Sequence, residues 1–533
     1  MISTFHGLET AKRGMTTQQN ALFVTGNNIS NANTPGYTRQ RVNFTQTEAF
    51  PPPSMNRPQI PGQMGTGVTA GSVERVRESF LDVQYRSESN KLGYWETRAD
   101  SLQKMEEVLN EPSEAGLSAV MDQFWGSLQD LSINPNNSGA RSVVRQRGIA
   151  VAETFNYLSS TLKSVQGDLK NEMDVSVTQV NSLLHQINNL NQKIADVEPH
   201  GLLPNDLYDQ RDSLVDQLST MVNISVKTTG TGGMPAKKPD GTPMALGKYT
   251  IELVTANGTR PLLSGNSNTV NELKVNYDKD TKMVESISVG PRVLDANGNP
   301  TEEISGTPID IEAFTASGKL RSLVDSYGFE TKALDHATGK HIVKGLYPEM
   351  LHKLDQMAYE FAAKFNEVHQ SGWDVKSIAA GTQTPRSFFD GVGSADGAAG
   401  SIKLHKDIAD SLDHIAAAGT KSIGDGSNAL KLAEVKNQPL SIDGETSTIQ
   451  SYYEGAIGDM AVQSQEAIRM TNNSGILQQS VDERRQSVSS VSLDEEMTNM
   501  IQFQHAYNAS ARMISLVDEM LDKIINGMGT VGR

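Results

Sequence analysis

Histidine is the residue type here that could most readily bind a metal or act as a general base, and the chain has 10 histidines in 533 residues. They are scattered singly. None lies in an H-E-x-x-H pattern, in which two histidines on one helix face bind zinc and the glutamate activates water. His505 has no second metal-binding side chain three or four residues away on its expected helix. We therefore interpret it as a surface histidine and predict no metal site.

Other patterns that carry chemistry are also missing. The sequence has no G-x-x-x-x-G-K-[ST] phosphate loop and no G-x-S-x-G nucleophile turn. Gly65, Gly67 and Gly71 resemble a dinucleotide-binding fingerprint, but the last spacing is wrong and no strand–helix unit surrounds them. The sequence therefore predicts no catalytic residue and no cofactor, and we expect that the protein is not an enzyme.

Composition argues against nucleic-acid binding and against several kinds of site and segment. A net charge of −16 leaves no excess of Lys and Arg to neutralise nucleic-acid phosphates. The chain has 0 cysteines, which excludes disulfides, zinc–thiolate sites and cysteine nucleophiles. No stretch approaches the roughly 20 apolar residues of a membrane span. The amino end also lacks the apolar core of a cleaved secretory signal.

The two ends of the chain have the apolar spacing of coiled-coil helices. In both segments the apolar positions alternate in steps of three and four. The expected amino-terminal seam is Leu8, Ala11, Met15, Leu22 and Ile29, interrupted by the polar Gln18 and Thr25. The expected carboxyl-terminal seam is Met500, Phe503, Tyr507, Ile514, Val517, Leu521, Ile524 and Met528, with Ser510 between them.

The two ends are also complementary in charge. Residues 1–45 carry four basic side chains and one acidic side chain, a net +3. Residues 490–533 carry six acidic and three basic side chains, a net −3. We therefore expect the two end helices to pair with each other. Spacing alone leaves open the alternative that each packs separately on the rest of the chain.

Long helical patterns occupy much of the sequence between the ends. Heptad spacing runs through residues 81–109, and a second pattern extends from about residue 140 to residue 197. Patterns of this length predict a rod or bundle, not a packed α/β body. Helical periodicity returns at residues 347–369 and 447–486.

Between these helical patterns the apolar period changes to two, from Ile224 to Val289, and Asn257-Gly258 indicates a hairpin turn. The predicted fold class is multidomain and mainly α, with paired terminal coiled-coil helices, an elongated helical bundle and an inserted antiparallel β domain. The expected units are a terminal assembly domain (1–45 with 490–533), a helical bundle (46–222 with 313–369 and 446–489), a β insert (223–312) and a small, loosely structured Gly/Ala-rich insertion (370–445).

A turn-rich stretch, NNISNANTPGYTRQRV at residues 27–42, follows the first helix. Proline then glycine suits the two central positions of a type II turn, and asparagine side chains can bond to a helix end. An ordinary helix stop would explain Pro35-Gly36 alone. We expect the turn to direct the next residues back along the subunit or onto a neighbour. The residues of this turn motif are Asn28, Asn31, Asn33, Pro35, Gly36 and Tyr37.

This stretch resembles the segment after the first helix in the flagellar axial family of rod, hook and hook-associated proteins. Four further segments are similar to the branch of that family placed at the hook–filament junction. These segments are 205–224, 318–327, 348–369 and 482–521. The β insert and residues 370–445 have no such resemblance.

The resemblance implies a structural subunit that joins hook to filament and assembles as a ring through its terminal helices. Its implied partners are further copies of itself, the hook protein, the third hook-associated protein on the filament side, and a flagellar export chaperone. It also implies export through the flagellar type III apparatus without a cleaved signal peptide, and an extracellular location in the flagellum.

Two alternative functions remain open at this point. A hook or distal rod structural protein would share both helical ends. A secreted surface adhesin would carry its binding function in the β insert.

Overall fold

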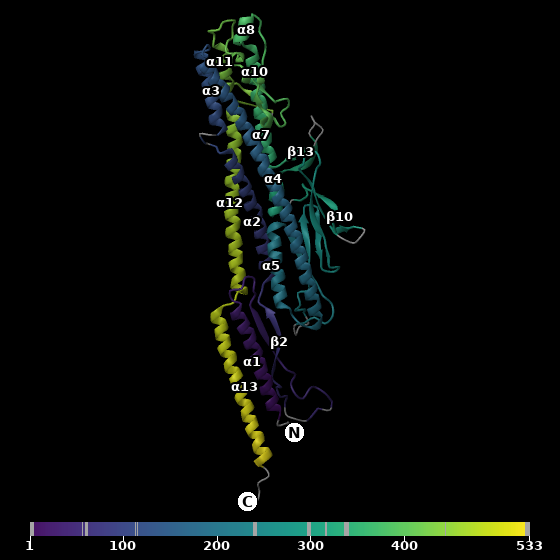
Figure 1. Ribbon diagram of the computed structural model, residues 1–533. Coiled ribbons are helices and arrows are strands. Elements are labelled where there is room, and N and C mark those ends of the chain that lie inside the picture. Colours follow the sequence, from purple (N-terminus) through teal and green to yellow (C-terminus); the bar gives the residue numbers. More distant parts are fainter. Residues whose placement is uncertain are drawn as a thin grey trace.

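The computed structural model describes residues 5–527 apart from residues 56, 59–61, 112, 114–115, 238–241, 296–299, 315–316, 335–340 and 443. The molecule is elongated, and both ends of the chain lie at its base (Figure 1). Among the described helices, none is both long and apolar enough to cross a membrane. The predicted fold class is confirmed, because a helical body connects paired terminal helices to inserted strands.

Helices α1 (His6–Ser30) and α13 (Leu493–Gly527) run antiparallel at the base (Figure 1). They approach closely where α1 has glycine. A Cβ on Gly14 would lie 3.2 Å from the Ser510 Oγ, and a Cβ on Gly7 would lie 3.6 Å from the Val517 Cγ2. The expected pairing of the two ends is confirmed, and separate packing is wrong.

The contact between α1 and α13 is shallow. Small and polar residues are the fully buried ones on α1, namely Thr17, Ala21, Thr25 and Asn28. The half-buried positions of the expected amino-terminal seam are Leu8, Ala11, Met15, Leu22 and Ile29. The half-buried positions of the carboxyl-terminal seam are Met500, Phe503, Tyr507, Ile514 and Leu521. Val517 is buried and Ile524 is 45 % exposed, while Met528 lies outside the described residues.

A β hairpin widens this terminal unit. Strand β1 (Gln40–Gln46) pairs antiparallel with β2 (Val68–Arg75). The Thr17 hydroxyl of α1 donates to the Val68 carbonyl at 3.1 Å, and the Phe44 ring meets Phe503 of α13 edge-on at 5.8 Å. The strand after the turn motif therefore runs back along the terminal helices of its own chain.

The helical body rises from this base. Helix α4 has 60 residues and is about 90 Å long at the usual rise of 1.5 Å per residue. Helix α12 runs alongside α2 and returns the chain to the base (Figure 1). The helices of the body are α2 (Ser79–Leu109), α3 (Leu117–Ile133), α4 (Ser138–Val197), α5 (Asn205–Met221), α6 (Lys319–Tyr327), α7 (Leu346–Ser371) and α12 (Ile449–Ser489).

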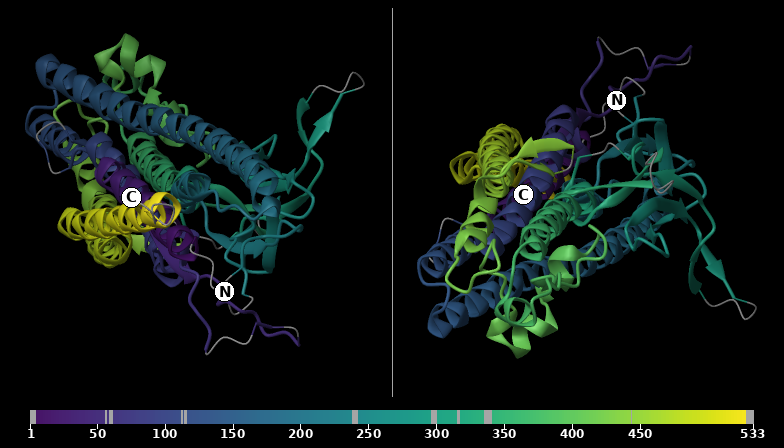
Figure 2. Two further views of the ribbon diagram at one scale, coloured as in Figure 1. Left: turned by 90° about the horizontal axis from the view of Figure 1, so that it is seen from below. Right: turned by 90° about the horizontal axis from the view of Figure 1, so that it is seen from above.

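The β insert lies on one side of the body (Figure 2). One sheet has the order β3-β4-β5-β6, and a second has β11-β8-β12-β13 with β7 also paired to β8. The strands are β3 (Ile224–Thr229), β4 (Lys248–Thr255), β5 (Gly258–Ser264), β6 (Thr269–Val270), β7 (Glu272–Tyr277), β8 (Val284–Gly290), β11 (Thr307–Asp310), β12 (Phe329–Leu334) and β13 (His341–Lys344). A separate hairpin consists of β9 (Arg292–Leu294) and β10 (Pro300–Ile304).

Two asparagines of α4 align both sheets with the body. The Asn191 amide donates to the Tyr249 carbonyl at 2.9 Å and accepts from the Tyr249 N–H at 3.0 Å. Asn181 makes the same two bonds with the backbone of Leu273, at 2.9 and 2.8 Å. The predicted hairpin joins β4 to β5, but its two turn residues are Ala256 and Asn257, one position before the expected Asn257-Gly258. The second sheet gains β12 and β13 from residues 329–344, beyond the expected end of the insert at 312.

The Gly/Ala-rich insertion is packed, contrary to the loose structure expected from its composition. Phe388 and Phe389 enter an aromatic cluster with Phe124, Phe361 and Phe365, whose ring centroids lie 4.9–6.4 Å apart. Small side chains allow close packing around these rings. The elements of this tip are α8 (Val375–Ala380), β14 (Phe389–Asp390), α9 (Ala398–Ser401), β15 (Lys403–Leu404), α10 (Lys406–Asp410), α11 (Ser427–Ala433), β16 (Leu440–Ile442) and β17 (Glu445–Ser447).

A buried histidine joins α7 to this tip. The His369 Nδ1–H donates to the Arg386 carbonyl at 2.7 Å, and its Nε2 accepts from the Ala416 N–H at 3.0 Å. These partners require the neutral ring, because Nε2 acts as an acceptor. Burial lowers the pKa of His369 from 6.5 to about 4.

The buried neutral histidine makes the stability of the tip pH-dependent. Between about pH 6.5 and 4 the unfolded chain binds a proton at His369 and the folded chain does not, so acidification favours unfolding by up to about 1.4 kcal/mol per pH unit. Urea unfolding followed across this range should show that slope. His369→Gln should reduce it, whereas the same change at the exposed His505 should leave it intact. An unchanged slope in His369→Gln would contradict this origin.

Candidate functional site

The candidate site is a structural joint between the terminal helices and the body. Among the described residues, no group of three or more His, Asp or Glu side chains is arranged to hold a metal ion. A network of buried and half-buried polar groups lies where the terminal helices meet the body, between the turn motif, the link from α12 to α13, and helix α5. We call this network the joint.

The turn motif forms the turn that its sequence predicts. The Tyr37 N–H donates to the Thr34 carbonyl at 3.2 Å, and Gly36 has φ of +80° at the position where a type II turn needs it. The Asn31 amide donates back to the Asn27 carbonyl at 3.0 Å, and the Thr34 hydroxyl donates to the Asn31 Oδ1 at 3.1 Å. These bonds close the end of α1 and fix the direction of the next residues.

Asn28 is the centre of the joint and is 1 % exposed. Its Nδ2 donates to the Gln40 carbonyl at 2.8 Å and to the Glu496 Oε2 at 3.0 Å. Its Oδ1 accepts from the Gln40 N–H at 3.0 Å and from the Tyr37 hydroxyl at 2.9 Å. This one amide therefore uses all four of its hydrogen bonds to connect α1, the turn, β1 and α13.

Arg39 fixes the link between α12 and α13. Its backbone N–H donates to the Ser489 carbonyl at 2.9 Å, at the last residue of α12. Its guanidinium contacts Glu496 at 2.8 Å and Glu495 at 2.7 Å, in the first turn of α13. The carboxylates at the amino end of α13 thus meet both the helix dipole and a cation.

Helix α5 connects the joint to the body. The Thr38 N–H donates to the Asp209 Oδ2 at 3.0 Å, and the Gln40 side chain donates to the Asp206 Oδ1 at 3.2 Å. Burial, together with the charges of Asp206, Asp209 and Glu496, raises the pKa of Tyr37 to about 12. The Tyr37 phenol stays protonated and remains a donor to Asn28.

Beside the joint, Asp212 of α5 is the anion shared by three arginines. Its carboxylate lies 3.0 Å from Arg75, 3.4 Å from Arg77 and 3.6 Å from Arg86, and it accepts from the Tyr249 hydroxyl at 2.7 Å. Burial would raise the pKa of Asp212, but the guanidinium groups outweigh burial and hold this pKa well below its usual range.

The neighbouring acids extend this cluster. Asp209 pairs with Arg75 at 2.6 Å, and Asp216 pairs with Arg86 at 2.7 Å and with Arg485 of α12 at 2.6 Å. One face of α5 is therefore bonded to β2, α2, α12 and β4.

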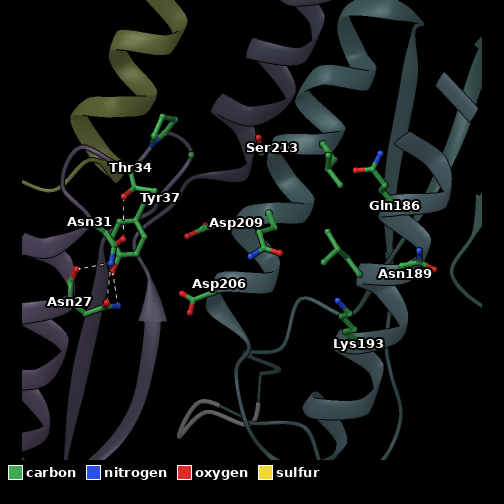
Figure 3. Close-up of a pocket in the computed structure, with 15 residues that line it drawn as sticks. Asn27, Asn31, Thr34, Tyr37, Gln186, Asn189, Lys193, Asp206, Asp209 and Ser213 are labelled. Carbon is green, nitrogen blue, oxygen red and sulfur yellow. Dashed lines mark hydrogen bonds between the residues drawn. The ribbon is translucent and has the colours of Figure 1, made fainter. Parts of the chain in front are cut away.

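An open cleft of about 710 Å³ separates the turn motif from α4 and α5 (Figure 3). Asn27, Asn31, Thr34 and Tyr37 line one wall. The polar side chains of the facing wall include Gln186, Asn189, Lys193, Asp206, Asp209 and Ser213. Leu190 and Leu214 also line the cleft, so its lining mixes polar and apolar groups, whereas small-molecule sites are predominantly apolar.

The motif residues have different surroundings. Asn28 is buried, Asn31 and Tyr37 are half-buried, and Asn33, Pro35 and Gly36 are exposed. Sequence reasoning missed the role of α5. Its signal was the spacing of Asp206, Asp209, Asp212 and Asp216, which places four acids on one helix face and predicts basic partners from elsewhere in the chain.

Removing the shared anion should destabilise the protein strongly. Asp212→Asn removes the common carboxylate of three largely buried guanidinium groups, of which Arg75 keeps Asp209, Arg77 keeps Asp82 and Arg86 keeps Asp216. Because each arginine retains one acid, the cost should lie near the lower end of the roughly 3–5 kcal/mol that breaking a buried ion pair costs. Urea unfolding of the purified protein measures this cost. The matched control is Asp100→Asn, which breaks an exposed pair with Lys104 at 2.7 Å and should cost less than about 1 kcal/mol. Equal costs would contradict the central role of Asp212.

Comparison with known sequences agrees with this architecture. The sequence model of the family described as "Flagellar hook-associated protein FlgK helical domain" matches residues 102–389. Models described as "Flagella basal body rod protein" and "Flagellar basal body rod FlgEFG protein C-terminal" match residues 8–38 and 484–527. The last two ranges coincide with the terminal helices and the joint.

Relatives match over the whole chain. Flagellar hook-associated protein 1 of Bacillus subtilis (strain 168) is 48 % identical over 542 residues, covering 100 % of both chains. Flagellar hook-associated protein 1 of Salmonella typhimurium is 23 % identical, covering 97 % of this chain and 98 % of the relative. The solved flagellar hook junction protein FlgK from Burkholderia pseudomallei has the same fold, with a TM-score of 0.58 at 15 % identity, covering 77 % of this chain and 100 % of that one. The chain belongs to the flagellar hook-associated protein 1 (FlgK) family.

Proposed function

We propose that the protein is a structural subunit of the bacterial flagellum that joins the hook to the filament, and that it has no catalytic activity. Family membership supports a flagellar structural role. The observation that carries the assembly role is the exposed apolar surface of α13. Side chains on this helix that are 45–71 % exposed are Leu493, Met497, Ile501, Met513, Leu516, Met520, Ile524 and Ile525. So much exposed apolar surface on one helix indicates a protein contact.

In this proposal, neighbouring copies complete a core that one chain leaves half covered. The seam between α1 and α13 contains Gln18, Thr25 and Ser510 among its apolar positions. A pair with such a seam is weakly stable alone and becomes ordered when adjacent subunits bury its remaining apolar surface. The methionines of α13 suit contacts between two polymers of different stiffness, because their side chains adapt to irregular surfaces.

The joint gives this subunit a defined angle between its assembling base and its outer body. Two connections of the chain meet in it, the turn from α1 to β1 and the link from α12 to α13. The bonds of Asn28 and Arg39 hold the two connections to each other. A subunit that joins two polymers needs such a fixed angle to set the direction of one relative to the other.

The remaining roles follow from family resemblance and belong to the same proposal. The neighbours would be further copies in a ring, the hook protein, and the third hook-associated protein on the filament side. Before assembly, an export chaperone would cover the exposed face of α13. Export through the flagellar type III apparatus would need no cleaved signal peptide and would place the subunit outside the cell.

Loss of the gene should leave hooks without filaments, because the filament would have no adaptor on which to assemble. Electron microscopy of the deletion strain, scored for hooks with and without filaments, measures this directly. Normal filaments on the mutant hooks would refute the junction role. Absence of the hooks themselves would instead favour the hook or rod alternative.

A point variant should separate the joint from general folding. Arg39→Glu places a third acidic group beside Glu495 and Glu496 and should reduce the number of filaments per cell severalfold. Arg41→Glu is the matched control, because Arg41 lies two residues further on, in β1, and is exposed. Equal filament numbers in the two strains would contradict the role of the joint.

Hydrogen exchange tests the proposed mobility of the terminal helices. In the isolated monomer, amides of residues 5–29 and 500–526 should exchange much faster than those of α4, because the thin seam opens without unfolding the body. In assembled flagella the same amides should be protected. Strong protection of both segments in the monomer would contradict ordering on assembly.

A further inference from the structure

The base of the molecule has an apolar groove beside the helix pair. It lies between α1, the chain that leads into β2, and α13, and its volume is about 860 Å³. Residues that line it include Ala11, Gly14, Met64, Val68 and Met513. Met513 is 52 % exposed at its edge.

Helix α13 extends past α1 at the same end of the molecule (Figure 1). Gly7 lies opposite Val517, and antiparallel helices advance equally per residue. The helical residues from Met520 onward therefore lie beyond the first described residues of α1. We call residues 520–527 the overhang. Its large apolar side chains Met520, Ile524 and Ile525 are 50 %, 45 % and 71 % exposed.

The groove and the overhang differ in charge. Lys12, which is exposed, follows Ala11 on the basic helix α1. Asp518 and Glu519, just before the overhang, and Asp522 within it are exposed, and Lys523 is an exposed base among them, so residues 518–527 carry a net charge of −2. A groove and an overhang from different copies therefore attract each other, whereas two overhangs repel.

We propose that the overhang of one copy occupies the groove of the next copy. This inference rests on the proposed function as a self-assembling subunit and names the surfaces that meet. The two surfaces are different parts of the chain, so the contact is head-to-tail and produces a ring or helical array instead of a closed pair. It also continues the contact between α1 and α13, because both surfaces border that pair.

The overhang cannot reach the groove of its own chain. In the observed register Ala11 lies near the level of Met513, and Ile524 is 11 residues further along α13, a separation of about 16 Å. A disulfide requires Cβ atoms about 3.8 Å apart. A covalent link between these two positions therefore reports a contact between copies.

The chain has 0 cysteines, so introduced cysteines report specific contacts. Ala11→Cys and Ile524→Cys would be made in separate full-length copies, expressed together in a strain that lacks the native gene, and oxidised in assembled flagella. The expected product is a disulfide-linked pair of one Ala11→Cys copy with one Ile524→Cys copy, identified by mass spectrometry. Gly14→Cys offers a second groove position if Ala11→Cys does not support filaments.

Matched controls define the groove. In the first control, Lys12→Cys is used in place of Ala11→Cys, which moves the thiol away from the groove. The yield of the disulfide-linked pair with Ile524→Cys should fall at least tenfold. Gly7→Cys and Val517→Cys in one chain should close within that chain, because a Cβ on Gly7 would lie 3.6 Å from the Val517 side chain. This pair confirms that oxidation is complete.

The outcomes separate this inference from the proposed function. Flagella with normal filaments but no link between positions 11 and 524 would overturn the inference and leave the junction role intact. Links of two Ala11→Cys copies or two Ile524→Cys copies would indicate a two-fold contact and would also overturn it. Filaments in cells that lack the gene would refute the junction role itself.

Discussion

The amide of Asn28 holds together two passes of the chain at the place where the terminal helices meet the body. One pass leaves α1 through the turn motif, and the other enters α13 from α12. Asn28 bonds to Gln40 on the first pass and to Glu496 on the second. Because the group is buried, each of these bonds would be costly to leave unmade. These bonds fix the two passes to each other, since neither pass can move without breaking the hydrogen bonds of Asn28.

The charged groups around α5 serve orientation more than stability. Removing three arginines and an aspartate from water is expensive, and the attraction between them at best offsets that cost. Such a cluster instead requires one particular arrangement of the elements. Asp212 must meet Arg75 of β2, Arg77 of the link to α2, and Arg86 of α2 at the same time. Apolar packing alone tolerates small shifts between helices. A structural subunit that joins two parts of a polymer needs the stricter condition.

Prediction from sequence succeeded where the pattern was periodic and local. The three-four spacing at both ends and the Pro35-Gly36 pair specify helices and a turn that depend on neighbouring residues. It failed where contacts are distant. Strands β12 and β13 carry no long alternation and join the second sheet only through β8. The tip folds because its few phenylalanines meet Phe124 and Phe361 from other helices, which composition does not reveal. The joint was half predicted: the asparagines were recognised, but their partners on α5 and α13 lie far away in the chain.

The contrast between a thin seam and a saturated joint follows from the work of an assembling subunit. If the terminal helices buried a full apolar core, the monomer would have little to gain from meeting its neighbours. If the joint were equally loose, assembly would order the helices without fixing the body that they carry. In this chain the buried residues of α1 are Thr17, Ala21, Thr25 and Asn28, of which only Asn28 belongs to the joint. The exposed apolar surface of the terminal helices thus remains available for contacts between copies. Directional hydrogen bonds and ion pairs of the joint fix the angle between the base and the body of each copy.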